Sequence, residues 1–306
     1  MTKTKQPILS ICIPTYNRAD ILRDNLEIIS EQLKRCNNAE VEIIVSDNCS
    51  PDNTREVVAN MQKSGLPIVY NRNAENIGAD GNFLKCMTIT SGKYVYLLGD
   101  DDFFAPNAIG RLLDILRGHD YGLVYINTRN NDGNVIEYHD QSKFIKEVSY
   151  FYTFMSGCVF RRDAIDKVRN HDKYIATHLL QMPFYLQSTM MSDSNVVVRF
   201  PILGETGADA QNNGGYNFLE VFVRNYLTIL DEYIDNKKLL AWLKKDIWLF
   251  VWMYTRRLLI EKNVGNFKTE KGWKILFKYY GSEWYFWWTL FKYPFGVIKR
   301  KIKKLL

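Results

Sequence analysis

The chain has 306 residues, enough for one large domain or a domain with an appendage, and for a sizeable hydrophobic core. Hydrophobic residues make up 46% and charged residues 24%, as in ordinary globular proteins, and a net charge of +6 is too mild to indicate nucleic-acid binding by itself. The five cysteines are scattered and the four histidines lack metal-ligand spacing, which argues against zinc. The polar start MTKTKQPILS does not resemble a signal peptide, so a reducing cytosolic setting is predicted. No apolar run reaches the roughly 18 to 20 residues of a membrane span.

Over the first hundred residues, short apolar runs alternate with helical patterns. Apolar residues from Ile21 to Leu33 repeat at helical spacing, a second helix is predicted through Val57 and Met61, and a short third helix around Phe83–Ile89. The predicted strands are Ile8–Ile13, Val41–Val45, Ile68–Tyr70 and Tyr94–Leu98. This alternation predicts βαβ units, and therefore an α/β fold with a mostly parallel, Rossmann-like sheet flanked by helices.

Polar clusters follow the predicted strands, and three adjacent carboxylates follow the fourth. Because ligands bind beyond the carboxyl ends of parallel strands, the clusters are expected to share one edge and form a site. They are Tyr16/Asn17, Asp47/Asn48, Asn76/Gly78 and Asp100–Asp102. Three neighbouring carboxylates repel one another, so a positive group should offset them, and Mg²⁺ takes one or two carboxylates together with water and phosphate oxygens. A solvated acidic turn is the alternative for the aspartates taken alone.

Four segments in this order carry a family resemblance: SICIPTYNR (10–18), VEIIVSDNCSPDNT (41–54), NRNAENIGADGNFLKC (71–86) and YVYLLGDDD (94–102). Together they resemble, over residues 8–120, the nucleotide-binding half of GT-A fold family 2 glycosyltransferases. Within that family the chain is most similar to abequosyltransferase-like O-antigen and capsule transferases. The resemblance implies an enzyme that transfers one sugar, with inversion, from a nucleotide-sugar to a hydroxyl of a growing surface glycan.

The resemblance also implies roles for individual residues. Pro14, Thr15, Tyr16 and Arg18 would line the base and ribose, and Asp47 would bond the base edge. The ribose and sugar phosphates would be covered by Asn76, Gly78, Asn82 and Lys85. Asp100 and its neighbour Asp101 would face the ribose or the donor sugar. Asp102, with Asp100, would hold the Mg²⁺ or Mn²⁺ ion that bridges the diphosphate.

The general base departs from the family pattern. An inverting transferase needs a base for the proton of the acceptor hydroxyl, and the family usually offers a carboxylate at the head of a helix. The matching segment, YIATHLL (174–180), has none. His178 is the predicted substitute because imidazole titrates near about pH 6.5. A packed core histidine is the alternative reading of this residue, and the other candidates for the base are Asp193, Asp172 and Asp209.

Beyond residue 120 the pattern is weaker. Leu123–Asn127 predicts a strand, and Arg129–Gly133 with Asn134–Tyr138 predicts a hairpin that turns at Asp132-Gly133. Ser156–Phe160 resembles the start of the acceptor half of these enzymes. Glu205–Asn217 is either a linker or a mobile lid over donor and metal. The QxxRW signature of processive polymer synthases is absent, which favours transfer of a single sugar.

All seven tryptophans follow Phe218, and helical patterns run through 219–234, 239–260 and 273–280. If residues 284–306 form a helix, one face carries an apolar stripe and the other faces carry lysines and an arginine. The stripe is formed by Phe295, Ile298, Ile302 and Leu305. Such a helix is typical of peripheral binding to an anionic bilayer, here the inner face of a bacterial plasma membrane, where a polyprenyl-diphosphate-linked acceptor would be reached. A helical subdomain packed on the catalytic core is the alternative.

The sequence thus predicts a GT-A catalytic domain over 1–216 and a helical, basic region over 217–306. Three other functions stay open. A nucleotidyl- or phosphotransferase would need a Gly- and Lys-rich phosphate loop after the first strand, where PTYNR stands. A non-catalytic nucleotide- or glycan-binding module would use the acidic edge only to hold a ligand. Nucleic-acid binding through the basic tail is disfavoured, because its lysines lie beside tryptophans.

Overall fold

The computed structural model describes residues 6–36, 38–206, 215–263 and 265–303. The chain forms two compact units. The first unit comprises Met1–Asn212 and Ile229–Ile247, and the second comprises Asn213–Thr228 and Trp248–Leu306. Residues 229–247 therefore pack with the first unit, and the predicted boundary after residue 216 stays a prediction.

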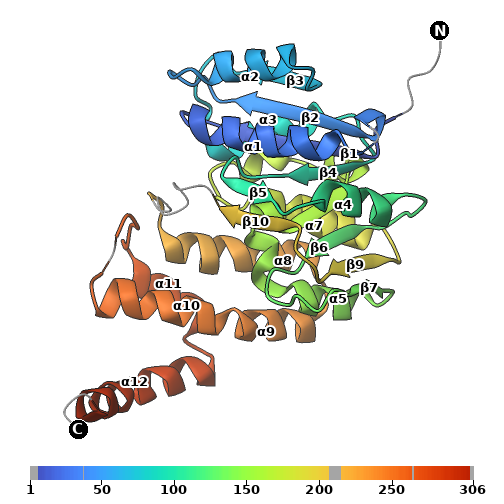
Figure 1. Cartoon of the computed structure of the whole chain (residues 1–306). Helices are drawn as coiled ribbons and strands as arrows, with labels where there is room; N and C mark the ends of the chain where they lie inside the picture. Colours follow the sequence, from blue (N-terminus) through green and yellow to red (C-terminus); the bar gives the residue numbers. More distant parts are fainter. Residues whose placement is uncertain (1–5, 37, 207–214, 264, 304–306) are drawn as a thin grey trace. The chain divides into compact units, whose positions relative to one another are not determined.

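An eight-stranded sheet forms the centre of the first unit, in the order β3-β2-β1-β4-β8-β6-β9-β7 (Figure 1). Its strands are β1 Leu9–Thr15, β2 Val41–Asp47, β3 Ile68–Arg72, β4 Tyr94–Leu97, β6 Leu123–Ile126, β7 Val135–Tyr138, β8 Cys158–Arg161 and β9 Asn195–Val198. β1 pairs in parallel with β2 and β4, and β2 with β3, whereas β8 runs antiparallel to β4 and β6. β9 is parallel to β6. The predicted α/β fold with a mostly parallel sheet is confirmed.

Helices bury both faces of the strands at the centre of this sheet. Every residue of β1 and β4 is buried, as expected for parallel strands between two helical layers. On α1, Leu22, Leu26 and Ile29 recur at helical spacing and join the core with Ile11 and Ile13 of β1. The helices before residue 212 are α1 Ala19–Leu33, α2 Thr54–Lys63, α3 Gly78–Thr88, α4 Ala108–Leu116, α5 Gln141–Val148, α6 Asp163–Lys167 and α7 Gln181–Met190, with short 3₁₀ turns at Asn38–Glu40, Ser149–Thr153, Met155–Gly157 and His171–Tyr174. α3 begins five residues before the predicted start at Phe83, at Gly78, where φ is +77°.

The predicted hairpin between Arg129–Gly133 and Asn134–Tyr138 is wrong. Val135–Tyr138 (β7) pairs instead with β9, antiparallel, with Val135 opposite Val198. The segment 129–133 (RNNDG) has no apolar side chain to bury, and its start is folded back by Asn127, whose Oδ1 accepts from the N–H groups of Arg129 and Asn130. β9 is buried throughout, so it offers β7 an apolar surface that 129–133 lacks.

A second, two-stranded sheet follows the triple aspartate. β5 (Asp102–Phe104) pairs antiparallel with β10 (Leu203–Thr206), with Asp102 opposite Thr206. Most of the segment Glu205–Asn217, predicted as a linker or lid, lies outside the described residues, which leave out 207–214.

Aromatic side chains form the core of the second unit. Phe218 stacks on Tyr254 with ring centroids 4.1 Å apart, and Trp248 lies 4.6 Å from Tyr280 and 5.5 Å from Phe286. The helices after residue 215 are the π-helix η6 Glu220–Asn225, α8 Tyr226–Tyr233, α9 Lys237–Asp246 in the first unit, α10 Trp248–Thr255, the π-helix η7 Arg256–Ile260, α11 Gly272–Tyr280 and α12 Trp284–Lys303. No helix in the described part of the chain is long and apolar enough to cross a membrane. The apolar face predicted from Phe295, Ile298, Ile302 and Leu305 lies outside the side chains that the structure describes.

Candidate functional site

The three aspartates lie at the carboxyl edge of the sheet, by which we mean the edge where β1 to β4 end. Thr15, the last residue of β1, donates from Oγ1 to Asp100 Oδ2 at 2.7 Å. Arg18 Nη1 lies 2.8 Å from Asp100 Oδ1 and 3.3 Å from Asp101 Oδ2. Burial raises the pKa of Asp100, while the Arg18 charge and the Thr15 hydrogen bond oppose this. Arg18 is therefore the positive group that the adjacent carboxylates require.

The backbone of this turn, residues 99–102, is held by α1. Asn25 is buried, and its Nδ2 lies within hydrogen-bond distance of the carbonyl oxygens of Gly99, Asp100 and Asp102, at 3.3, 3.0 and 3.2 Å. A Cβ at Gly99 would lie 2.8 Å from Asp102 Oδ2 and 3.0 Å from Asp101 Oδ1. Glycine is needed there because the carboxylates fold back over the turn.

Ser156 orients Asp102. β8 is antiparallel to β4, so its start lies beside the end of β4 and brings Ser156 to the turn. The Ser156 hydroxyl donates to Asp102 Oδ2 at 2.6 Å and accepts the N–H of Gly99 at 2.9 Å. Burial raises the pKa of Asp102, the Ser156 hydrogen bond opposes this, and the Asp101 charge adds to it. Ser156 is fully buried.

The donor set at this turn fits a hard divalent cation that is completed by its ligand. Among the described residues, no group of three or more His, Cys, Asp or Glu side chains could hold a metal. Mg²⁺ and Mn²⁺ do not need such a cage, because one or two carboxylates with water and phosphate oxygens suffice. Asp102 Oδ2 accepts from Ser156, whereas both oxygens of Asp100 accept protein hydrogen bonds. Asp102 is thus the better placed of the two predicted ligands.

Asp47, at the end of β2, is fully buried and accepts hydrogen bonds at both oxygens. The Tyr70 hydroxyl donates to Oδ2 at 2.6 Å, Arg72 Nε lies 3.3 Å from the same oxygen, and the N–H of Ser50 donates to Oδ1 at 2.8 Å. Burial raises the pKa of Tyr70, and its hydrogen bond to Asp47 adds to this. Asp47 therefore joins β2, β3 and the following turn, and its predicted contact with the base edge stays a prediction.

A network of amides ties β1, β2 and α3 together at the carboxyl edge. Asn82, on α3, donates to the carbonyl oxygens of Ser46 at 2.8 Å and Thr15 at 3.5 Å, and accepts from the Ser46 hydroxyl at 2.7 Å. Asn48 Nδ2 donates to Asn76 Oδ1 at 2.8 Å and to the Gly78 carbonyl at 3.2 Å. Four predicted donor-binding positions on three segments are therefore brought together: Thr15, Asn76, Gly78 and Asn82.

The remaining predicted donor-binding residues differ in exposure. Pro14 is buried within β1, whereas the Tyr16 side chain, two residues on, is 45% exposed. Lys85 is exposed on α3. Of the three, Tyr16 lies directly beyond the end of β1 and is free to cover a ligand there.

His178 is held near the same edge by a carboxylate of α3. Its side chain is exposed, so it is not a packed core histidine. Its backbone N–H donates to Oδ2 of Asp80, in the first turn of α3, at 2.9 Å. His178 and Ala176 both have left-handed backbone conformations, with φ of 58° and 67°.

The other candidate bases are placed differently. Asp172 is exposed and contacts the ring of its neighbour His171. β4 and β6 are both antiparallel to β8, and β9 is parallel to β6, so β9 runs in the same direction as β4. Because Asp193 precedes β9 and the three aspartates follow β4, Asp193 lies at the opposite edge of the sheet. Asp209 lies outside the described residues.

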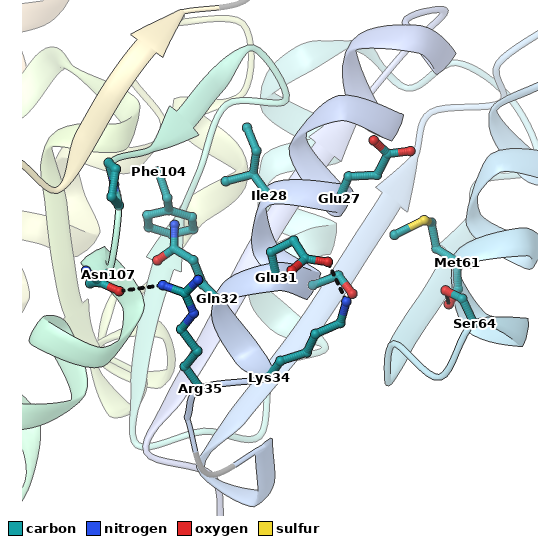
Figure 2. A pocket seen from close by; sticks show the side chains of 12 residues that line it. Glu27, Ile28, Glu31, Gln32, Lys34, Arg35, Met61, Ser64, Phe104 and Asn107 are labelled. Carbon is teal, nitrogen blue, oxygen red and sulfur yellow. Dashed lines mark hydrogen bonds and ion pairs between the residues drawn. The ribbon is translucent and has the colours of Figure 1, made fainter.

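A cleft of about 780 Å³ in the first unit is separate from these residues (Figure 2). It is lined by the second half of α1, the end of α2 and the segment after β5. Figure 2 shows its polar contacts, an ion pair between Lys34 and Glu31 and a hydrogen bond from Arg35 to Asn107. No residue predicted from the sequence to bind donor or metal lines this cleft. The candidate site is therefore marked by the convergence of polar side chains at the carboxyl edge and not by this cleft.

The chain belongs to glycosyltransferase family 2. The model of this family, described as Glycosyl transferase family 2, matches residues 10–190, which include the three aspartates, the asparagine network, Ser156 and His178. The family resemblance inferred from the four sequence segments is confirmed.

Two curated relatives illustrate the likeness in sequence. Abequosyltransferase RfbV of Salmonella typhimurium is 39% identical over 106 residues, 34% of this chain and 31% of that protein. The GalNAc(5)-diNAcBac-PP-undecaprenol beta-1,3-glucosyltransferase of Campylobacter jejuni is 37% identical over 109 residues, 35% of this chain and 34% of that protein. The matched region thus spans about a third of each relative.

Solved structures share the fold at low identity. S. aureus TarS 1–349 superposes with a TM-score of 0.56 and 17% identity, over 84% of this chain and 73% of that one. The mannosyltransferase PcManGT from Pyrobaculum calidifontis, solved with GDP-Man and Mn²⁺, gives a TM-score of 0.55 and 16% identity over 79% and 71%. The predicted GT-A fold is confirmed.

Several residues of the site could not be found from the sequence pattern. Asn25 lies within the amphipathic helix α1, Ser156 in a segment without periodicity, and Asp80 before the helix that was predicted around Phe83–Ile89. Only the polar character of Asn25 at a buried helical position is a signal, since such a residue needs hydrogen-bond partners.

Proposed function

We propose that this protein transfers one sugar from a nucleotide-sugar to an acceptor hydroxyl, with inversion and with a divalent cation, as a non-processive family 2 glycosyltransferase. The observation that carries the proposal is the turn 99–102, in which Arg18, Thr15 and Ser156 hold three carboxylates at the carboxyl edge. The nucleotide would lie beside this turn, between Tyr16 and the start of α3.

Asp102, with Asp100, would hold Mg²⁺ or Mn²⁺, and the bound cation would neutralise charge on the departing nucleoside diphosphate. Arg18 forms ion pairs with both Asp100 and Asp101 in this turn, and Ser156 fixes the direction of Asp102. The TarS structure with UDP-GlcNAc and the PcManGT structure with GDP-Man and Mn²⁺ support a nucleotide-sugar donor and a metal.

His178 would act as the base. In the proposed step the acceptor oxygen bonds to the anomeric carbon, the bond between that carbon and the phosphate oxygen breaks, and the hydroxyl proton passes to the His178 ring. The exposed side chain supports this role, because a base has to reach the acceptor.

The acceptor would be a polyprenyl-diphosphate-linked glycan at the inner face of a bacterial plasma membrane. The name of the C. jejuni relative, which acts on a PP-undecaprenol glycan, supports this class of acceptor. Exposed aromatic side chains on α12, at Trp284, Trp287, Trp288 and Phe291, support a peripheral association with the bilayer.

A thermal-shift screen tests the proposal directly. UDP, CDP, GDP and dTDP are each added with and without Mn²⁺ to the wild type, to Asp102→Ala and to the control Asp114→Ala, in which an exposed carboxylate of α4 is removed. A ligand that binds the folded state raises the midpoint in proportion to RT ln(1 + [L]/Kd). We expect one nucleotide to stabilise the wild type and the control only with Mn²⁺, and Asp102→Ala not at all.

If none of the four nucleotides stabilises the wild type, the proposed donor site is contradicted and a non-catalytic module becomes the better explanation of the acidic edge. If one of them stabilises Asp102→Ala as strongly as the wild type, the role of Asp102 is contradicted.

A further inference from the structure

Asp80 is a buried carboxylate that accepts a hydrogen bond from the backbone of a distant loop. It is 4% exposed, and no lysine or arginine of the described chain forms an ion pair with it. Oδ2 accepts the N–H of His178, 98 residues away, at 2.9 Å. Burial raises the pKa of Asp80, and the hydrogen bond from the His178 backbone opposes this rise.

The loop that contains His178 has a strained backbone. Ala176 and His178 both adopt φ values near +60°, which cost a non-glycine residue about 1 kcal/mol or more each. Such conformations persist only where neighbouring contacts fix them. At its other end the loop is fixed by Glu232 Oε2, which accepts from Lys173 Nζ and the Tyr174 hydroxyl, each at 2.7 Å. Residues 173–178, the His178 loop, are thus anchored at both ends within the first unit.

The helix that carries Asp80 is itself bonded to the strand ends. Asn82, two residues further along α3, donates to the Ser46 and Thr15 carbonyls, and Thr15 also bonds Asp100. A continuous set of hydrogen bonds therefore leads from the three aspartates through β1 and α3 to the His178 loop.

We infer that Asp80 is a positioning residue, which holds the His178 loop against α3 so that His178 faces the bound donor. The inference depends on the proposed function for its kinetic consequence, whereas the loop contact itself does not. Asp80 does not touch the reacting atoms in this assignment; it acts through the backbone of residues 176–178.

A double-mutant cycle with a structural readout tests the inference. The variants are Asp80→Asn, His178→Ala and the pair, with Asp114→Asn as control, since Asp114 is an exposed carboxylate bonded to Arg117. Asp80→Asn keeps the size but loses the charge and one acceptor oxygen; Asp80→Ala is a second variant. Turnover is measured as nucleoside diphosphate release from UDP-, CDP-, GDP- and dTDP-sugars, and exchange of the 176–178 amides by hydrogen–deuterium exchange.

We expect Asp80→Asn to lower kcat by about 10- to 100-fold, as misplacement of a catalytic group does, and to speed exchange of the 176–178 amides at least about tenfold, as loss of an ordering contact does. The rise in melting temperature that the nucleotide causes in Asp80→Asn should equal the rise that it causes in the Asp114→Asn control. In the His178→Ala background, Asp80→Asn should lower kcat no further, because its effect passes through His178.

Equal losses from Asp80→Asn with and without His178 would overturn the inference, as would unchanged exchange of the loop amides in both Asp80 variants. Absence of turnover in the wild type would contradict the proposed function instead. The exchange data would then still decide whether Asp80 holds the loop.

Discussion

Donors from three other segments keep the three adjacent carboxylates of the first unit together. Thr15 ends β1 and Arg18 follows it, Asn25 lies on α1 and Ser156 precedes β8. Each carboxylate oxygen that is buried without a donor would cost about 1 to 3 kcal/mol or more. The turn is therefore pre-formed by the fold, and a ligand does not have to order it.

Ser156 offers a test of this pre-formed geometry. Ser156→Ala removes the hydrogen bond to Asp102 and leaves the Gly99 N–H without its acceptor. Loss of an outer-shell partner of a metal ligand typically lowers metal affinity about 10- to 100-fold. We expect that decrease in the affinity for the Mn²⁺ complex of the nucleotide selected by thermal shift, measured by titration calorimetry.

Ser188 is a matched control for this change. It is also fully buried, and its hydroxyl likewise accepts a backbone N–H at 2.9 Å, from Arg161, and donates at 2.6 Å, to the Gly122 carbonyl. Ser188→Ala should lower stability by a similar amount without a change in Mn²⁺–nucleotide affinity. Equal affinity losses in both serine variants would refute a specific role of Ser156.

The sequence located the carboxylates but not the groups that hold them. Asp100 to Asp102 directly follow an apolar strand, a local pattern that predicts a site at a sheet edge. Ser156 and Asp80 bond partners that are 54 and 98 residues away, at Asp102 and His178. No local periodicity encodes contacts of that range, so they required the strand order and the antiparallel direction of β8.

Among the elements, α1 and α2 share a cap at Asp52. One oxygen of Asp52 accepts the N–H of Ala19, the first residue of α1, at 2.9 Å, and the other accepts the N–H and hydroxyl of Thr54, the first residue of α2. Burial acts to raise the pKa of Asp52, but the hydrogen bonds from Thr54 and Ala19 outweigh it and the net pKa is lowered.

Asp52→Ala should therefore lower the free energy of unfolding by about 1 to 2 kcal/mol at pH 7, the usual cost of a lost helix cap. The pKa of Asp52 is lower in the folded state than in the unfolded state. The charged carboxylate therefore stabilises the fold fully above the unfolded-state pKa of about 3.9, and this stabilisation is lost as the pH falls through the folded-state pKa. Urea unfolding of wild type and variant at pH 7 and at about pH 3 measures the difference, which should shrink at the lower pH. Asp20→Ala, an exposed residue of the first turn of α1, is the control and should change stability by less than about 0.5 kcal/mol.

The order of elements followed from hydrophobic patterning wherever strands were apolar. β1, β2, β3 and β4 lie where their apolar runs predicted them. β1 and β4 are buried along their whole length between helices, whereas β3, at the end of the sheet, buries Ile68 and exposes Val69. The partner of Val135–Tyr138 was not predictable in this way. The apolar residues of Val135–Tyr138 could pack against any neighbouring strand. Their pairing with β9, and not with residues 129–133, depends on the distant segment Asn195–Val198.

On the scale of the whole molecule, the second unit has tryptophans of two kinds. Trp248 is buried against Tyr280 and Phe286, so it stabilises the unit. Trp284, Trp288 and Phe291 on α12 are 50% to 66% exposed. Exposed aromatic side chains followed by basic residues suit the interface of an anionic bilayer, where rings lie at headgroup depth and cations pair with lipid phosphates. The basic residues are Lys299, Arg300, Lys301, Lys303 and Lys304.

The last prediction separates membrane association from the integrity of this unit. Removing all of α12 would remove Tyr285 and Phe286 from their contacts with Trp248, so the triple variant Trp284→Ser, Trp288→Ser, Phe291→Ser is preferable.

Loss of three interfacial aromatic side chains should lower partitioning onto phosphatidylglycerol-containing vesicles at least about tenfold, since each buried ring contributes about 1.5 to 3 kcal/mol. Vesicle sedimentation measures this, with phosphatidylcholine vesicles and Trp242→Ser, an exposed tryptophan of α9, as controls. If the triple variant sediments with vesicles as well as Trp242→Ser does, α12 is excluded as the membrane contact. If only the triple variant loses sedimentation and its nucleotide-induced thermal shift is intact, the lipid contact is assigned to α12 and the donor site to the first unit.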